Sequence, residues 1–335
     1  MLYGKVPGIA NPAPRLLLGT MIVTVKEPER SFALLDDAFA RGFTGLDTAN
    51  NYAGGNSERC IGRWMEQRGN RDKIFILTKG AHPNEDRARV TPFDIAADLH
   101  DSLARLRTDH IDLYLLHRDD ESVPVGPIVE TLNEHHAAGR VRAFGGSNWT
   151  HRRLAEANDY AAKHGLVPFA ASSPNYSLAV AVQQIWPGCL SLNGPDKTET
   201  RDWYRRTQMP IFAWSSLGRG FFSGRLTRAN FEQVQSTIDA GCRRAFCHEV
   251  NFQRLDRVEQ LAQEKGASVP QVALAWVLHQ PLNVFALVGA AGADELDSNL
   301  AALDLTLSPS ELAWLNLESD ARAARGSGHH DSRSA

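Results

Sequence analysis

The stretch Gly45-Leu46-Asp47-Thr48-Ala49-Asn50-Asn51-Tyr52 decides the fold that we expect for this chain. An apolar run ends in an acid, and a tyrosine follows on a polar loop. The pattern returns twice, because residues 74–78 lead into Lys79 and residues 111–116 lead into His117. Short apolar runs of this kind are typical of buried strands. The carboxyl ends of parallel strands meet at one edge of a sheet, so we expect Asp47, Lys79 and His117 to converge, with Tyr52 on the adjoining loop.

Strand-like and helix-like segments alternate along the rest of the chain. The predicted strands are 15–21, 42–47, 74–79, 111–117, 141–146, 169–172, 211–215 and 283–289. The predicted helices are 31–41, 57–65, 91–106, 127–138, 150–164, 198–207, 252–265, 269–279, 294–302 and 309–318. Eight strand–helix alternations predict a closed parallel (β/α)8 barrel, the TIM barrel, as a single domain over residues 1–318. Long loops follow the sixth and seventh strands, and we expect residues 319–335 to form a disordered tail.

An open, doubly wound sheet is the alternative to a barrel. Nucleotide-binding folds of that class carry a Gly-x-Gly-x-x-Gly motif after the first strand. No such motif follows residues 15–21 in this chain. The sequence therefore favours the closed barrel.

The composition is that of a globular protein with one large core. The 335 residues are 43% hydrophobic and 22% charged, and the formal net charge of −3 offers no basic face for nucleic acid. The first residues lack the apolar core of a signal peptide, and no apolar run approaches the roughly 18 residues that cross a membrane. The four cysteines are scattered, so we expect reduced thiols in a cytoplasmic protein. Cys242, Cys247 and His248 lie close in sequence, but without a second ligand pair we expect no metal site.

Together, Asp47, Tyr52, Lys79 and His117 can transfer a proton to a carbonyl oxygen. A tyrosine has a pKa of about 10, and a lysine ammonium beside it favours the phenolate and lowers that pKa. The aspartate keeps the lysine charged and in place, and a neutral histidine can hydrogen-bond the same substrate oxygen. Tyr52 would then donate a proton as negative charge develops on that oxygen, or accept one in the reverse direction.

These motifs resemble those of the aldo-keto reductase superfamily. Asp47-Thr48-Ala49-x-x-Tyr52 resembles its Asp-Thr-Ala-x-x-Tyr signature, and the segments that end in Lys79 and His117 resemble its lysine and histidine blocks. Residues 139–148 are similar to the block that ends in its Ser-Asn pair, and residues 214–220 resemble its Tyr-Ser-Pro-Leu-Gly-x-Gly loop. The resemblance covers about residues 15–318 in order. It implies a nicotinamide-dependent enzyme that interconverts a carbonyl compound and an alcohol.

The resemblance implies a role for each matching residue. Tyr52 would be the proton donor, Lys79 and Asp47 its tuning pair, and His117 the residue that orients the substrate carbonyl. Ser147 and Asn148 would bind the nicotinamide carboxamide, Trp214 would stack on its ring, residues 215–220 would hold the pyrophosphate, and residues 289–299 would cover the adenosine. The implied cofactor-binding residues are Thr20, Met21, Asp47, Ser147, Asn148, Ser173, Trp214, Ser215, Leu217, Gly218, Arg219, Gly220, Gly289, Glu295 and Asn299.

Two positions depart from the family pattern. Ser173 stands where the family usually has a glutamine beside the nicotinamide, although a serine can still form a hydrogen bond. Glu295 stands where NADPH-preferring members often have an arginine. A carboxylate repels a 2′-phosphate but can bond a free 2′-hydroxyl, so this residue favours NADH, whereas the habit of the family favours NADPH. The sequence leaves the choice between NADPH and NADH open.

Charged residues directly follow His117, in the order Arg118-Asp119-Asp120. At the rim of the mouth they indicate a small polar carbonyl substrate, such as a sugar-derived aldehyde or ketone. The alternative is that these charges pair with each other in a salt bridge at the rim. The predicted substrate-binding residues are Tyr52, His117, Arg118 and Trp149, with Trp186, Phe221 and Phe222 as further candidate walls.

Two other functions fit a barrel of this kind. The first is a dinucleotide-binding sensor or accessory subunit without significant turnover, against which the intact set of four residues argues. The second is a metal-dependent hydrolase that uses Asp47 and His117. It predicts more His and Asp at strand ends, whereas the fifth and seventh strands end in Ser147-Asn148 and Ser215-Ser216. The oligomeric state is not readable from the sequence.

Overall fold

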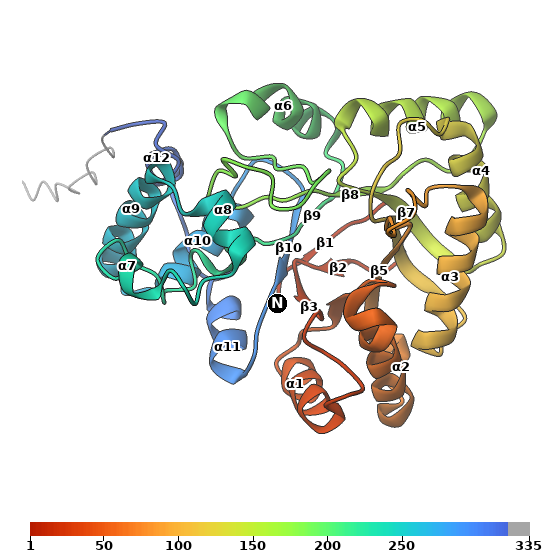
Figure 1. Cartoon of the computed structure of the whole chain (residues 1–335), viewed down its shortest axis with the longest axis horizontal. Coiled ribbons are helices and arrows are strands. Elements are labelled where there is room, and N and C mark those ends of the chain that lie inside the picture. The colour runs from red at the N-terminus through yellow and green to blue at the C-terminus, as the bar shows by residue number, and fades with distance from the viewer. Residues whose placement is uncertain (321–335) are drawn as a thin grey trace, which may run out of the picture.

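The computed structural model describes residues 1–320, and these form a closed barrel of parallel strands. The strand order is β10-β3-β4-β5-β6-β7-β8-β9, and helices surround the barrel (Figure 1). The barrel strands are β3 (Leu16–Gly19), β4 (Gly45–Asp47), β5 (Phe75–Gly80), β6 (Ile111–Leu116), β7 (Val141–Ser147), β8 (Ala171–Ser173), β9 (Ile211–Ala213) and β10 (Val284–Val288). The predicted (β/α)8 architecture is confirmed. Residues 321–335 of the predicted tail lie outside the described residues.

At least one helix follows every strand of the barrel. The helices are α1 (Pro28–Ala40), α2 (Asn56–Arg68), α3 (Pro92–Leu106), α4 (Val125–Ala137), α5 (His151–His164), α6 (Thr198–Thr207), α7 (Phe231–Val234), α8 (Ala240–Phe246), α9 (Glu249–Lys265), α10 (Val269–Leu278), α11 (Ala293–Ala301) and α12 (Pro309–Leu315). The short helices α7 and α8 lie in the long connection after β9. None of the helices in residues 1–320 is both long enough and apolar enough to cross a membrane.

Local chemistry explains where the elements differ from the predicted ones. A hairpin of β1 (Tyr3–Gly4) and β2 (Ala13–Pro14) precedes the barrel, and strands of two residues are too short to give a periodic signal. Strand β9 ends before Ser215, because that residue has a left-handed backbone with φ of 53° that cannot continue a strand. Helix α1 begins earlier than predicted, since Pro28 suits the first helical turn.

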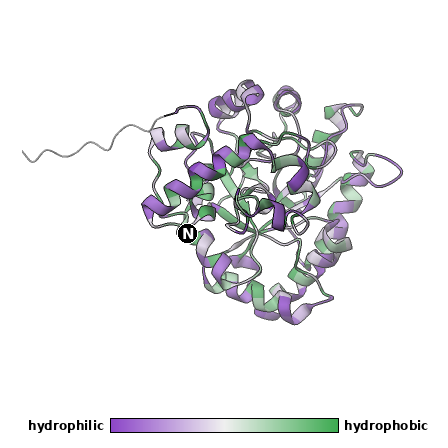
Figure 2. Cartoon of the chain, turned by 60° about the vertical axis from the view of Figure 1, so that its left-hand side comes forward, coloured by the Kyte–Doolittle hydropathy of each residue, from purple (hydrophilic) through white to green (hydrophobic). Residues whose placement is uncertain are grey.

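The hydrophobic core has two layers. The inner cluster fills the barrel, and Val6 and Ala13 from the N-terminal segment join it. Within it the rings of Phe212 and Phe285 stack with their centroids 4.7 Å apart. The larger cluster lies between the strands and the helices. Figure 2 shows hydrophobic residues along the central strands and hydrophilic residues over the outer faces of the helices. A filled interior leaves the loops at the strand ends as the place for a site.

Helices α2 and α3 approach each other closely at Gly62. A Cβ atom at this position would lie 2.3 Å from the Arg105 carbonyl oxygen, which belongs to the backbone of α3. We predict that Gly62→Ala lowers the free energy of unfolding by about 1–3 kcal/mol, because one of the two helices must shift. Urea denaturation at neutral pH measures this change. Gln67→Ala, on an exposed position of the same helix, is the matched control, and an equal effect of both substitutions would contradict the prediction.

Candidate active site

The four residues predicted to carry the chemistry lie together at the C-terminal end of the barrel. Asp47 ends β4, Lys79 lies on β5, and His117 directly follows β6. The Nζ atom of Lys79 lies 2.5 Å from Asp47 Oδ1 and 3.4 Å from the Tyr52 hydroxyl. The rings of Tyr52 and His117 meet edge to face, with their centroids 6.0 Å apart. The structure therefore brings all four side chains together.

Backbone pairing explains why these side chains meet. The Asn50 amide, on the loop after β4, donates to the Lys79 carbonyl at 2.8 Å, so this loop continues along β5. Lys79 Nζ also donates to the Thr48 carbonyl at 2.9 Å. Tyr52 then opens a short 3-10 helix, η1 (Tyr52–Gly55), in which Ala53 has a left-handed φ of 49°. This turn holds the Tyr52 hydroxyl within reach of Lys79.

Asp47 and Lys79 form a buried salt bridge. Burial raises the pKa of Asp47, and the charge of Lys79 opposes that shift. Burial alone would lower the pKa of Lys79, but the Asp47 charge and the Tyr52 hydroxyl raise it overall. The Lys79 side chain is only 2% exposed, so its charge depends on these partners rather than on water.

Tyr52 keeps its proton at neutral pH. Burial raises the pKa of Tyr52, although Lys79 acts in the opposite direction. The sequence predicted that the lysine lowers this pKa, and its charge does act in that direction. The net shift is nevertheless upward, because the loss of water around the hydroxyl has a larger effect than the nearby ammonium. A protonated phenol beside an ammonium group can act as a general acid.

His117 is neutral at neutral pH. Burial lowers the pKa of His117 well below its usual range, and the charges of Lys79 and Arg118 lower it further. A second imidazole, His82, lies against it, with the ring centroids 4.9 Å apart. His82 is part of the mouth although no sequence motif pointed to it. Two uncharged imidazoles therefore lie in a row beside Tyr52: His117 contacts the Tyr52 ring, and His82 contacts His117.

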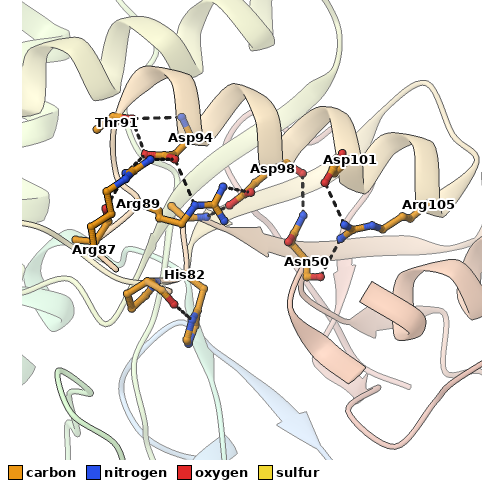
Figure 3. A network of polar contacts seen from close by, with 12 residues as sticks. Asn50, His82, Arg87, Arg89, Thr91, Asp94, Asp98, Asp101 and Arg105 are labelled. Atoms are coloured by element: carbon orange, nitrogen blue, oxygen red, sulfur yellow. Dashed lines mark hydrogen bonds and ion pairs between the residues drawn. The ribbon is translucent and has the colours of Figure 1, made fainter. Parts of the chain in front are cut away.

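Salt bridges to helix α3 hold the segment that carries His82 (Figure 3). Arg87 Nη1 donates to Asp94 Oδ2 at 2.6 Å, and Arg89 Nε donates to Asp94 Oδ1 at 3.3 Å. Asp94 is 1% exposed, and the guanidinium of Arg87 holds the pKa of its carboxyl group well below the usual range. These bonds fix residues 81–90 against the first turn of α3.

Asp98 is the second anchor on the same helix (Figure 3). Its carboxylate accepts from the Ala81 amide at 2.8 Å and from Arg89 Nη2 at 2.7 Å. Its carbonyl oxygen accepts from Asn50 Nδ2 at 3.2 Å. Helix α3 therefore positions both the loop that leads to Tyr52 and the loop that carries the second imidazole.

The residues implied to bind the nicotinamide meet at the ends of β7 and β8. Ser147 Oγ donates to the Ser173 carbonyl at 2.9 Å, and Asn148 Oδ1 accepts from the Leu190 amide at 3.2 Å. Ser173 Oγ donates to the Phe212 carbonyl at 2.6 Å, so its lone pairs remain for a ligand donor. These three side chains are adjacent, although each already has a partner within the chain.

The loop after β9 brings Trp214 and Arg219 next to Trp186. The rings of Trp214 and Trp186 lie 5.6 Å apart, and the Arg219 guanidinium lies 4.2 Å above the Trp186 ring. Arg219 Nε also donates to Asp239 at 2.8 Å, so the carboxylate partly balances the charge of the guanidinium. The left-handed residues of this loop are Ser215, Gly218, Arg219 and Gly220, with Leu217 between them. Turns of this kind form anion-binding concavities from backbone N–H groups.

A cation that the sequence did not predict lies beside the segment implied to cover the adenosine. Asn299 Nδ2 donates to the Gly289 carbonyl at 3.1 Å, and Glu295 Oε2 accepts from the Ala291 amide at 2.7 Å. Arg225, from the long loop after β9, donates to Glu295 Oε1 at 2.8 Å. The two partners are 70 residues apart, so no local pattern could predict the contact.

Several residues predicted to line the mouth are buried in this structure. Trp149, predicted to bind substrate, is 1% exposed and donates from Nε1 to the Arg118 carbonyl at 3.1 Å. Phe221 and Phe222, predicted as walls, are fully buried in the core. Thr20 is also fully buried and bonds the Asp47 carbonyl, so it supports the site from behind, whereas the neighbouring Met21 is 58% exposed at the mouth. Hydrophobicity alone does not distinguish a pocket wall from a core residue.

Buried polar atoms without a hydrogen-bond partner lie at Trp214 and its neighbours Asn175 and Ser191, and also at His117. Buried side-chain atoms without a hydrogen-bond partner include Trp214 Nε1, Asn175 Oδ1, Ser191 Oγ and His117 Nδ1. Buried polar groups normally have a partner, so such a group indicates a place for water or a ligand. Both donors and acceptors are present, which fits the carboxamide of a nicotinamide. The described residues contain no group of three or more His, Cys, Asp or Glu placed to hold a metal.

Comparison with known proteins identifies the family. The model of the aldo/keto reductase family matches residues 15–316. An uncharacterized oxidoreductase, YrpG of Bacillus subtilis, is 30% identical over 90% of this chain and 91% of its own length. The NADP(+)-dependent aryl-alcohol dehydrogenase of Phanerodontia chrysosporium is 29% identical over 89% of this chain and 77% of its own. The norsolorinic acid reductase of Emericella nidulans is 28% identical over 85% of this chain and 70% of its own length.

Solved structures show the same fold. An aldo-keto reductase from Klebsiella pneumoniae in complex with NADPH has a TM-score of 0.70 and 25% identity, and covers 95% of each chain. The thermostable aldo-keto reductase Tm1743 has a TM-score of 0.72 over 95% of this chain and 100% of its own. The chain belongs to the aldo/keto reductase family, and it is an NAD(P)-dependent oxidoreductase of carbonyl compounds.

The Asp94 anchor gives a pH-dependent prediction. Its pKa in the folded chain lies below the value of about 3.9 in an unfolded chain, so its stabilising effect is complete above that value and is lost as the pH falls. We predict that Asp94→Asn lowers the free energy of unfolding by about 1–2 kcal/mol at pH 7, and by less near pH 3. Asp101→Asn, which removes a 62% exposed partner of Arg105 on the same helix, should cost less at pH 7. A pH-independent loss in urea denaturation would refute the assignment.

Proposed function

We propose that this enzyme reduces an aldehyde or ketone to an alcohol, reversibly, with Tyr52 as the general acid and base. The observation that carries the proposal is the Lys79 ammonium, which contacts both Asp47 at 2.5 Å and the Tyr52 hydroxyl at 3.4 Å. Bound NADPH or NADH would supply a hydride to the carbonyl carbon. The protein must then deliver a proton to the carbonyl oxygen.

The four side chains divide that task. Tyr52 donates its proton as the oxygen gains negative charge, and Lys79 stabilises the phenolate that remains. Asp47 holds Lys79 in place and balances its charge. His117, being neutral, can bond the substrate oxygen without placing a second cation there. In alcohol oxidation the phenolate of Tyr52 accepts the proton back.

The cofactor would lie across the ends of β7 to β10. Ser147, Asn148 and Ser173 would face the carboxamide, and Trp214 would stack on the ring. The turn at residues 215–220, with Arg219, would hold the pyrophosphate, and Gly289, Glu295 and Asn299 would border the adenosine. The unpartnered atoms near Trp214 support this placement.

We propose NADPH as the favoured cofactor. The relatives above include an NADP(+)-dependent dehydrogenase and a reductase solved with NADPH. Arg225 brings a positive charge to Glu295, which the sequence had presented as an isolated carboxylate. An arginine beside the adenosine would favour a 2′-phosphate, and its pairing reduces the repulsion from Glu295.

An aromatic carbonyl compound is the substrate class that the mouth supports best. Tyr52 and His82 place their rings against His117, and Trp186 and Trp214 lie ring to ring where the loops after β8 and β9 meet. Two similar relatives are named for an aryl alcohol and for norsolorinic acid. The sugar-derived substrate expected from the charged rim remains a prediction, and an aldose belongs in any substrate panel.

Replacing the proton donor tests the proposed function. We predict that Tyr52→Phe lowers kcat for benzaldehyde reduction by roughly 10²- to 10⁴-fold, because the proton has no donor. NADPH binding, followed by quenching of tryptophan fluorescence, should stay within about twofold of wild type. Tyr160→Phe, which removes an exposed hydroxyl that bonds Glu130, is the control and should keep full activity. Equal turnover by the Tyr52 variant would refute the assigned role.

The cofactor preference is tested at the pair of Arg225 and Glu295. We predict that Arg225→Gln raises KM for NADPH about fivefold, equivalent to roughly 1 kcal/mol for an exposed contact, with no change for NADH. Glu295→Gln should lower KM for NADPH, since a repelling charge is removed. Arg228→Gln is the control on the same loop, because Arg228 pairs with Glu249 and Asp256 instead. A shift that is equal for both cofactors would argue against a contact with the 2′-phosphate.

A further inference from the structure

Arg118, at the rim next to His117, is separated from the acids that follow it in sequence. Asp119 turns away and accepts from Arg153 Nε at 3.1 Å. Asp120 accepts from the amide and hydroxyl of Ser122. Within residues 1–320 no carboxylate forms a salt bridge with Arg118. The salt bridge at the rim, which was the alternative to a substrate contact, is therefore absent for this residue.

Other cations of the mouth are compensated within the chain. Lys79 pairs with Asp47, and Arg219 pairs with Asp239. Arg118 is half-buried, so water does not fully replace the missing counter-charge. A partly buried cation without a partner is unfavourable unless a ligand of opposite charge binds it.

The Arg118 guanidinium is held in place before any ligand binds. Its Nη1 donates to the His117 carbonyl at 2.8 Å, and its own carbonyl accepts from Trp149 Nε1. The same His117 carbonyl accepts from Asn148 Nδ2 at 3.3 Å. Across the mouth, a Cβ atom on Gly188 would lie 4.0 Å from Arg118 Cδ, so the side chain lies between the loop after β6 and the loop after β8. Its charge also acts on the pKa of His117, after the larger effects of burial and Lys79.

We propose that the carbonyl substrate carries an anionic substituent, a carboxylate or a phosphate, that the Arg118 guanidinium binds. A guanidinium has five N–H donors, and its planar fork matches the two oxygens of a carboxylate or phosphate. One donor is used by the His117 carbonyl, and the others remain for a ligand. Because the Arg118 guanidinium bonds the backbone of His117, whose ring contacts that of Tyr52, an anion on it leaves the rest of a short substrate near the Tyr52 hydroxyl. The proposal rests on the proposed function and adds to it that the carbonyl substrate carries an anionic group.

Matched substrates test the proposal. We would measure kcat/KM of the NADPH-dependent reduction for benzaldehyde and 4-carboxybenzaldehyde, and for glyceraldehyde and glyceraldehyde 3-phosphate. The quantity of interest is the ratio between the charged and the neutral member of each pair, in which any general loss of activity cancels. We expect wild type to prefer the charged member of at least one pair, and the pair that shows the preference distinguishes carboxylate from phosphate.

Variants at Arg118 then change that ratio. Arg118→Met should lower it at least tenfold, mainly through KM of the charged substrate, because a charge-assisted bidentate contact is lost. Arg118→Lys should recover part of it, since a lysine keeps the charge but not the fork. Arg152→Met is the control, because Arg152 is exposed, pairs with Glu199 and should leave the ratio as in wild type. A ratio of one or less in wild type for both pairs, or a ratio unchanged in Arg118→Met, overturns the proposal while the reductase function stands.

A binding measurement keeps the two proposals separable. Benzoate is titrated into the protein with NADPH present, and the fluorescence of the nearby tryptophans reports its binding. Binding at least tenfold weaker in Arg118→Met than in wild type supports the anion site, even if no carbonyl in the panel is reduced and the proposed function fails. Equal affinity in both proteins, with wild-type folding confirmed by circular dichroism, overturns the anion site.

Discussion

The buried ion pair of Lys79 and Asp47 is the interaction on which the rest of the mouth depends. Two charges taken out of water are costly unless they lie close together and their other hydrogen bonds are made. Lys79 meets this condition with Asp47 at 2.5 Å, the Thr48 carbonyl at 2.9 Å and the Tyr52 hydroxyl at 3.4 Å. These partners come from one strand end and its loop, and the lysine comes from the next strand. A parallel barrel in this register supplies them together.

The same burial determines what the neighbours of the pair can do. Tyr52 and His117 both stay neutral at neutral pH because desolvation disfavours their charged forms. A neutral phenol is held near an ammonium in a site with little water, where the attraction between opposite charges is strong. The attraction is small while the phenol is intact and grows as the proton leaves. Burial that discourages spontaneous ionisation therefore favours ionisation coupled to proton transfer, which is the condition for stabilising a transition state.

The strands and the loops differ in how well the sequence predicts them. Asp47, Lys79 and His117 could be predicted because each ends an apolar run, and parallel pairing brings such ends together whatever the loops do. The packing of Trp149 could not, since an aromatic residue after a strand packs equally well in a pocket or in the core, and only tertiary packing decides. The orientation of Asp119, in the loop after β6, depends on Arg153, which lies 34 residues away on α5. Strands of two residues, and contacts between residues so far apart in sequence, leave no periodic or local signal.

Substitutions at the strand ends and in the loops are expected to change different properties of the enzyme. The strand ends hold the proposed proton-transfer group, so we expect substitutions there to alter the reaction itself. The loops after β6 and β9 carry the charges that we propose to meet a ligand, Arg118 at one end and the pair of Arg225 and Glu295 at the other. Each of these is held by one or two contacts at the edge of the barrel rather than by the core. A substrate or cofactor preference can therefore shift through single loop residues while the Lys79–Asp47 pair, and the chemistry it supports, stays intact.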